Sequence, residues 1–177
     1  PLERDRAERH LQKKIETFQA WLTQRGMIAA AHKMSTMVIP GKTHGKGAPN
    51  CQPNFEYDGG KIPIKKCQKY LGIWWDSSWT FEKQLKKICA EIKSRAAAIK
   101  QLSTSSWEPS PKILLDLVAI YAEPIARYGI TAWFPWARSE LKKKVDNELR
   151  KAWRACLNLP ASTNNHVLLA EAEQLQL

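Results

Sequence analysis

Residues 69–103 have the sequence KYLGIWWDSSWTFEKQLKKICAEIKSRAAAIKQLS, in which an apolar run precedes the clearest amphipathic helix of the chain. We interpret residues 70–75 as a well-buried strand, in which Gly72 lets a partner backbone or a ligand come close. Apolar side chains then recur every three or four positions, which predicts a helix over residues 80–103 with one side facing a core. The residues of that side are Phe81, Leu85, Ile88, Ile92, Ala96 and Ile99.

The lysines of this helix gather on the side opposite its apolar residues. At about 100° per residue, Lys83, Lys86 and Lys87 project there, and Lys93 lies near them. Residues 61–100 hold ten Lys and Arg against three Asp and Glu, and so contribute most of the chain's net charge of +11. A localised basic surface is typical of proteins that bind nucleic acid, but a solvated lysine-rich face has the same composition.

The residues before this stretch predict one helix and a few short strands. Apolar positions at helical spacing predict a helix over residues 3–25, ended by Gly26. Residues 34–39 have β-type composition, and residues 41–53 have that of a loop. Residues 55–57 and 62–64 flank a turn at residues 58–60, which predicts a hairpin whose second arm is made an edge strand by Pro63.

The residues after this stretch predict two further helices. Ser110 followed by Pro111 is a typical helix start, and the helix over residues 111–127 is apolar nearly all round, so we expect it at the centre of the core. Pro124 should kink that helix or end it early. A last amphipathic helix is predicted at about residues 138–157. The chain is therefore expected to be α+β, passing into a helical bundle near residues 77–79.

Composition excludes several classes of protein. Eight Trp and 44% hydrophobic residues are incompatible with intrinsic disorder. The longest apolar stretch, residues 113–126, is interrupted by charges and shorter than the roughly 20 residues of a membrane span. The first ten residues are too charged for a secretory signal. Four cysteines without a C-x-x-C pair indicate reduced thiols and no metal site, so we expect an intracellular protein, nuclear or cytoplasmic.

Recognisable catalytic motifs are absent from the sequence: it contains no nucleophile elbow, no H-E-x-x-H, no P-loop and no Asp-Asp pair. The residues by themselves therefore predict a basic α+β binding module. They leave open whether its partner is a nucleic acid or another protein.

Five signatures in order resemble the region downstream of the catalytic aspartates in reverse transcriptases of LINE-type (non-LTR) retrotransposons. Gly26 and Lys33 lie seven residues apart, as in the family, although Ala30 and Met34 differ from its pattern. The other four are KYLGIWWD at residues 69–76, the basic helix, YGITAW at residues 128–133 and RACLNLPAST at residues 154–163.

The resemblance implies a fold in which residues 1–76 are the C-terminal part of a polymerase palm and residues 77–177 a helical thumb with a C-terminal extension. The palm aspartates, which hold two Mg²⁺ ions in this family, would lie upstream of Pro1. We therefore expect a fragment or remnant of an RNA-directed DNA polymerase that is inactive alone and has no cofactor of its own. Its expected partners are an RNA–DNA or similar duplex and the missing N-terminal palm and fingers half.

The resemblance also implies roles for individual residues. Lys33 matches a lysine that helps to protonate the pyrophosphate leaving group, which makes it a candidate general acid. Tyr70, Leu71 and Gly72 match the primer grip. The lysines would contact duplex phosphates without reading sequence, and binding should weaken steeply with salt. This expected phosphate track consists of Lys65, Lys66, Lys69, Lys83, Lys86, Lys87 and Lys93.

A second hypothesis belongs to a different class. The chain could be a non-catalytic protein-interaction module derived from a reverse transcriptase, with no useful affinity for nucleic acid. A thumb without its palm would expose apolar residues, which could support self-association or a new partner. Charge reversal of the helix lysines distinguishes the two hypotheses.

Overall fold

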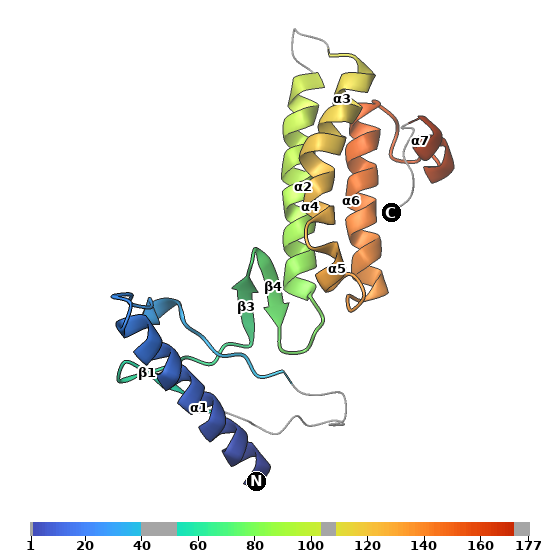
Figure 1. Cartoon of the computed structure of the whole chain (residues 1–177). Coiled ribbons are helices and arrows are strands. Elements are labelled where there is room, and N and C mark those ends of the chain that lie inside the picture. Colours follow the sequence, from blue (N-terminus) through green and yellow to red (C-terminus); the bar gives the residue numbers. More distant parts are fainter. Residues whose placement is uncertain (1, 40–52, 104–108, 172–177) are drawn as a thin grey trace. The chain divides into compact units, whose positions relative to one another are not determined.

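The structure is a computed structural model that describes residues 2–39, 53–103 and 109–171 (Figure 1). Helices and small two-stranded sheets make it broadly α+β, as predicted. The chain forms two compact units: Pro1–Tyr70 with Asp76–Ser78, here called the N-terminal unit, and Leu71–Trp75 with Trp79–Leu177, here called the helical unit. The loop expected at residues 41–53 lies, except for Pro53, outside the described residues.

In the N-terminal unit, helix α1 (Leu2–Thr23) packs against strand β1 (Glu56–Tyr57). Gly26 follows the helix with a φ of +66°, as expected of the residue that ends it. The side chain of Gln12 binds both backbone groups of Glu56, accepting from its N–H at 3.1 Å and donating to its carbonyl at 3.2 Å. The buried hydrophobic residues of this unit are Leu22, Phe55 and Tyr57.

The predicted hairpin is present with a shorter turn than expected. Strand β1 pairs antiparallel with β2 (Gly60–Lys61), and Tyr57 stands opposite Gly60. Asp58 and Gly59 both have positive φ, as a two-residue type I′ turn requires, so Gly60 belongs to the strand. The strand predicted at residues 34–39 is wrong. A 3₁₀ turn (Ala31–Lys33) precedes these residues, and among them Thr36 alone pairs, in a single parallel bridge to Ile64. The bridge cannot continue toward Met34 because Pro63 has no N–H to donate.

The strand predicted over residues 70–75 is also wrong, because the apolar run contains a turn. Strands β3 (Cys67–Tyr70) and β4 (Ile73–Asp76) form a two-stranded sheet, joined by Leu71 and Gly72. These two residues have φ values of +46° and +84°, which a strand does not tolerate. Leu71 is 73% exposed, so the apolar character of this position does not reflect burial within the chain.

The helical unit is built on α2 (Glu82–Ser103) and α6 (Ser139–Cys156), which lie side by side (Figure 1). Both predicted apolar sides are confirmed. On α2, Ala96 is half-buried and Leu85, Ile88, Ile92 and Ile99 are buried, as is Phe81 directly before the helix. On α6, Leu141 is half-buried and Val145, Leu149, Ala152 and Trp153 are buried. Helix α7 (Asn165–Glu171) packs against α6.

The third helical segment of this unit is α3 (Pro111–Leu117), a π-helical turn η2 (Val118–Ala122) and α4 (Glu123–Arg127). Ser110 caps its start by accepting a hydrogen bond from the Ile113 N–H, as predicted. In a regular α-helix the ring of Pro124 would meet the carbonyl of the residue four positions earlier, and the wider π turn directly precedes it. The chain therefore passes Pro124 without ending the helical segment.

The expectation that this segment is buried all round is wrong. Only the sides that face α2 and α6 are covered, and they bury Leu114, Val118, Ala122 and Ala126. On the remaining side, Ile120 is 75% exposed and Tyr121 is 48% exposed. Arg95 of α2 lies over the Tyr121 ring, but Ile120 remains largely uncovered by the described elements of the helical unit, so the apolar composition of the segment exceeds what its own core buries.

Aromatic side chains connect β4 to the start of α2. Trp75, Trp79 and Phe81 contact one another edge to face, and Trp136 packs on Trp79 with ring centroids 5.3 Å apart. Trp79 and Phe81 both have positive φ, which is costly for bulky residues. The aromatic contacts, with Phe81 only 1% exposed, hold the backbone in this conformation.

Candidate nucleic-acid interface

The turn between β3 and β4 is held by Tyr128, which lies at the end of α4. The Tyr128 hydroxyl donates a hydrogen bond of 2.7 Å to the carbonyl of Leu71. A Cβ atom on Gly72 would lie 3.0 Å from the ring and the hydroxyl oxygen of Tyr128. Gly72 is therefore required twice, once for its positive φ and once for the close approach of this ring.

The next residue, Gly129, makes a second contact between the same two segments. It has a φ of +60°, and a Cβ atom on it would lie 2.3 Å from Cδ1 of Ile73. Helix α5 (Ile130–Trp133) begins directly after it, and the Trp133 indole N–H donates to the Tyr128 carbonyl at 3.1 Å. The motifs at residues 69–76 and 128–133, both used in the family resemblance, thus meet in space.

Two of the three residues predicted as a primer grip project from this turn. Tyr70 is 63% exposed and Leu71 is more exposed still, whereas Gly72 is half-buried beneath Tyr128. Neither Tyr70 nor Leu71 contributes to the buried core, so both side chains are available to a partner. The three residues form a tight turn with two exposed side chains, and the primer-grip role stays a prediction.

A groove of about 260 Å³ beside the turn is lined by charged side chains that already have partners. Lys87 forms an ion pair of 3.3 Å with Glu91 on the same helix. Arg95 donates to the backbone carbonyl of Tyr121 and lies over its ring at 4.4 Å. The buried Gln84 accepts from the Trp74 N–H at 3.0 Å. These contacts tie α2 to η2 and β4, which favours a structural role for the groove.

The four lysines predicted on α2 differ in their surroundings. Lys83 lies over the Trp74 ring at 3.3 Å, which is a cation–π contact. Lys86 pairs with Glu82 at 2.6 Å, but its side chain remains 70% exposed. Lys93 is exposed and lines a groove between α2 and α6. Of these four, Lys93 lies on the side of α2 that adjoins α6, and Lys86, seven residues earlier, shares that side by helical periodicity.

Helix α6 adds lysines that the sequence analysis missed. The groove between α2 and α6 has a volume of about 210 Å³, and its lining includes four alanines together with Lys93, Lys100 and Lys151. Its only acidic lining residue is Glu148, which pairs with Lys151 at 2.7 Å. Burial raises the pKa of the nearby Cys89 thiol, and Glu148 raises it further, whereas Lys144 and Lys151 lower it. Both lysines of α6 therefore lie close enough to Cys89 of α2 to influence its charge.

These lysines follow a seven-residue spacing on each helix. Because seven residues are almost two helical turns, such residues share one side, about 10 Å apart. We call them the lysine rows: Lys86, Lys93 and Lys100 on α2, and Lys144 and Lys151 on α6. The recurrence is visible in the sequence. It could have been found by testing the helix at residues 138–157 for a basic side as well as an apolar one.

The remaining predicted residues belong to the N-terminal unit. Lys65, Lys66 and Lys69 are exposed around the start of β3, and Lys33 is exposed at the end of its 3₁₀ turn. The structure does not join these residues and the lysines of α2 into one surface, because they belong to different units. Their expected roles stay predictions.

Within the described ranges, no group of three His, Cys, Asp or Glu side chains could hold a metal ion, and no helix is long and apolar enough to cross a membrane. Cys67, Cys89 and Cys156 are free thiols, and burial raises the pKa of Cys156 to about 11. Cys51 lies outside the described residues.

Comparison with known proteins adds no assignment: no family model, no curated protein and no solved structure matches this chain. A functional conclusion therefore depends on the residues and their geometry.

Proposed function

We propose that the helical unit binds the phosphate backbone of a nucleic-acid duplex without reading its sequence, as the thumb of a reverse transcriptase would. The observation that carries the proposal is the pair of lysine rows on adjacent sides of α2 and α6. Evenly spaced lysines on two neighbouring helices match a repeating row of phosphates better than a single small ligand.

The charge balance of the rows supports this proposal. Two of their five lysines pair with a carboxylate of the same helix, Lys86 with Glu82 and Lys151 with Glu148. Lysines outnumber the acidic residues of the groove lining by three to one, Lys93, Lys100 and Lys151 against Glu148. The alanines that line the groove are short, so a phosphate backbone can approach the helices and be reached from both rows.

The exposed turn between β3 and β4 supplies the second part of the proposal. Leu71 is held outward by Tyr128 and would contact the sugar face of a strand end, the position of a primer grip. Polymerisation would need the aspartates and Mg²⁺ ions of a separate palm. Lys33 would act as general acid only in that setting, so we propose duplex binding as the activity of this chain.

The test compares two double charge reversals that alter the net charge equally. Lys93→Glu/Lys144→Glu changes one lysine in each row, whereas Lys112→Glu/Lys143→Glu changes exposed lysines of the same unit outside the rows. Binding of a fluorescent RNA–DNA hybrid is measured by anisotropy at fixed salt. The row variant should bind at least about tenfold more weakly than the control variant, because phosphate contacts dominate such affinity.

Two results would count against the proposal. Equal losses in both variants would show that net charge, and not the rows, determines binding. No binding by the wild-type chain even at low salt would favour the second hypothesis, a protein-interaction module without affinity for nucleic acid.

A further inference from the structure

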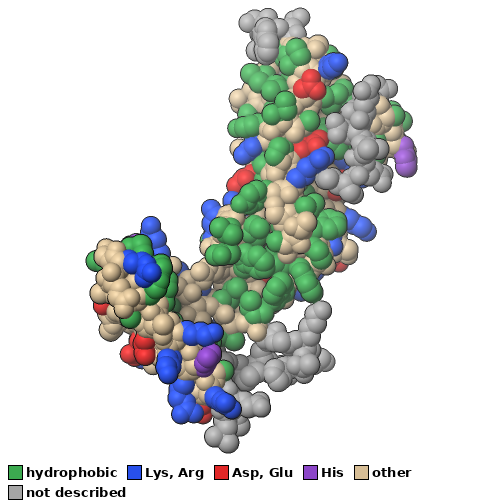
Figure 2. All heavy atoms as spheres, in the orientation of Figure 1, with side chains coloured by type: hydrophobic (Ala, Val, Ile, Leu, Met, Phe, Trp, Pro, Cys, Tyr) green, Lys and Arg blue, Asp and Glu red, His purple; other side chains and the backbone are tan. Residues whose placement is uncertain are grey.

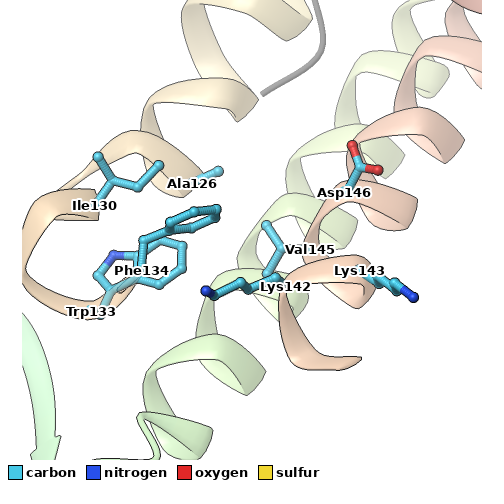
Figure 3. Close-up of a pocket in the computed structure, with 8 residues that line it drawn as sticks. All are labelled: Ala126, Ile130, Trp133, Phe134, Lys142, Lys143, Val145 and Asp146. Carbon is cyan, nitrogen blue, oxygen red and sulfur yellow. The ribbon is translucent and has the colours of Figure 1, made fainter. Parts of the chain in front are cut away.

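The helical unit contains an apolar pocket that the proposed duplex interface does not use. Figure 3 shows Ala126, Ile130, Trp133 and Phe134 on the side of α4 and α5, facing Val145 on α6. The pocket has a volume of about 180 Å³. Phe134 forms one wall and is 40% exposed, so the pocket is open at the surface.

The rim of this pocket is basic. Lys142 lies over the Phe134 ring at 4.3 Å, and Lys143 follows it on α6 (Figure 3). The one acidic lining residue, Asp146, pairs with Arg150 at 2.6 Å, so its charge is compensated within α6. Figure 3 shows the Lys142 side chain turned toward Phe134 and the Lys143 side chain turned away from it, so Lys142 is the charge that a partner in the pocket meets.

The surroundings of the pocket extend its apolar character. Figure 2 shows hydrophobic side chains gathered over the end of the helical unit that contains α4 and α5. Exposed apolar areas rimmed by polar residues are typical of interaction sites.

The size and lining of the pocket restrict its occupant. Ligand sites for cofactors and drug-sized molecules are about 300–1,000 Å³, so this pocket holds one large side chain and not a cofactor. A nucleic-acid base fits poorly, since its polar edge needs hydrogen-bond partners and the indole N–H of Trp133 is already used by Tyr128. An apolar side chain has no such requirement.

We propose that this pocket docks a peptide segment of another protein through one Leu, Phe or Trp anchor flanked by acidic residues. The anchor fills the space between Phe134 and Val145, and a flanking carboxylate meets Lys142 at the rim. Anchors of this kind, seated in a small pocket with a polar rim, carry most of the energy of many protein interfaces. The inference is independent of duplex binding, because none of its residues belongs to the lysine rows.

The probe is a displayed library of twelve-residue peptides with one variable apolar position between acidic flanks, selected against the full chain. The peptide bound best is labelled and titrated by fluorescence anisotropy. Two variants alter the pocket, Phe134→Ala at its wall and Lys142→Glu at its rim. Two matched variants leave it intact: Ile120→Ala removes a more exposed apolar side chain, and Lys112→Glu reverses an exposed lysine of α3 that belongs to neither the pocket nor the lysine rows.

The expected result is a loss of about tenfold or more for Phe134→Ala, and of about three- to tenfold at low salt for Lys142→Glu. Both control variants should stay within about twofold of the wild type. The proposal is overturned if no peptide is selected, or if the controls lose as much affinity as the pocket variants. It is also overturned if a peptide with lysine flanks binds equally well. Circular dichroism of each variant confirms that the fold is retained.

Discussion

The hydroxyl of Tyr128 donates a hydrogen bond to the carbonyl oxygen of Leu71, and the two residues stand 57 positions apart in the sequence. This bond joins the tip of the β3–β4 hairpin to the end of α4. It also explains why a glycine follows each partner, since Gly72 makes room for the tyrosine ring and Gly129 for Ile73. The hairpin tip is thereby positioned by the helical bundle.

Replacing Tyr128 by Phe should destabilise the helical unit slightly. The variant keeps the ring and loses only the hydrogen bond to Leu71, which at this half-exposed site is worth about 0.5–1 kcal/mol. Urea unfolding followed by tryptophan fluorescence measures the change. Tyr121→Phe is the control, because no described residue contacts its hydroxyl through a hydrogen bond, and an equal loss there would contradict the interpretation.

Gly129→Ala should be one of the most destabilising single substitutions in the unit. The new Cβ would lie 2.3 Å from Ile73 Cδ1, in a backbone conformation that alanine rarely adopts. Together these effects cost about 2–4 kcal/mol. Adding Ile73→Val removes the nearest atom, so the double variant should be more stable than the sum of the two losses predicts. If the stability losses of the two single variants simply add, the close approach of Gly129 to Ile73 does not contribute to the destabilisation.

The ion pair between Glu123 and Arg127 should respond more strongly to mutation than an exposed pair. Glu123 has a side chain that is 6% exposed, so Arg127→Met leaves a buried carboxylate without its charge partner, at a cost of about 1–3 kcal/mol. Lys86→Met breaks the exposed pair with Glu82 and should cost at most about 0.5 kcal/mol. Thermal unfolding of both variants measures the two losses of stability, and equal losses would contradict this prediction.

Cys156 should make stability depend on pH in the alkaline range. Burial raises the pKa of this thiol from 9.0 to about 11, so the unfolded chain loses the proton at a lower pH than the folded one. The thiol has no effect below pH 9 and lowers stability as the pH rises toward about 11, by at most about 1.4 kcal/mol per unit. Urea unfolding across this range should show a shallower fall for Cys156→Ala, and parallel curves would contradict the assignment.

The α2 helix was predictable because its apolar residues occupy one side and its charges the other. Phe81, Leu85 and Ile92 recur at helical spacing, and all three are buried. The same spacing rule gave the buried side of α6. Local patterns succeed where burial is one-sided and the element is long.

The hairpin at Leu71 could not be predicted from composition, because a run of apolar residues favours a buried strand wherever it occurs. The information that decides the turn is the positive φ of Leu71 and its hydrogen bond to Tyr128, a contact between distant residues. Gly72 was the one residue in this run whose type indicated a turn. In the same way, the exposed side of Ile120 and Tyr121 depends on which neighbours cover η2, which periodicity alone does not reveal.

The sequence predicted some of the lysines of the candidate interface, but not how they are arranged on neighbouring helices. Lys86 and Lys93 were predicted from the sequence and belong to the proposed lysine rows, whereas Lys83 contacts Trp74 and Lys87 pairs with Glu91. Lys144 and Lys151 were missed, because pairing the basic sides of two helices requires knowing that α2 and α6 are neighbours. That adjacency comes only from the tertiary structure.

The most direct test of duplex binding is the salt dependence of affinity for an RNA–DNA hybrid of about 20 base pairs, measured by anisotropy between about 50 and 200 mM salt. Each phosphate contact contributes about −0.9 to the slope of log K against log salt. With five lysines in the rows, we predict a wild-type slope of about −4 to −5, made shallower by about 2 in Lys93→Glu/Lys144→Glu. A slope near zero, or one that the row variant leaves unchanged, would contradict the claim that the lysine rows bind the duplex backbone.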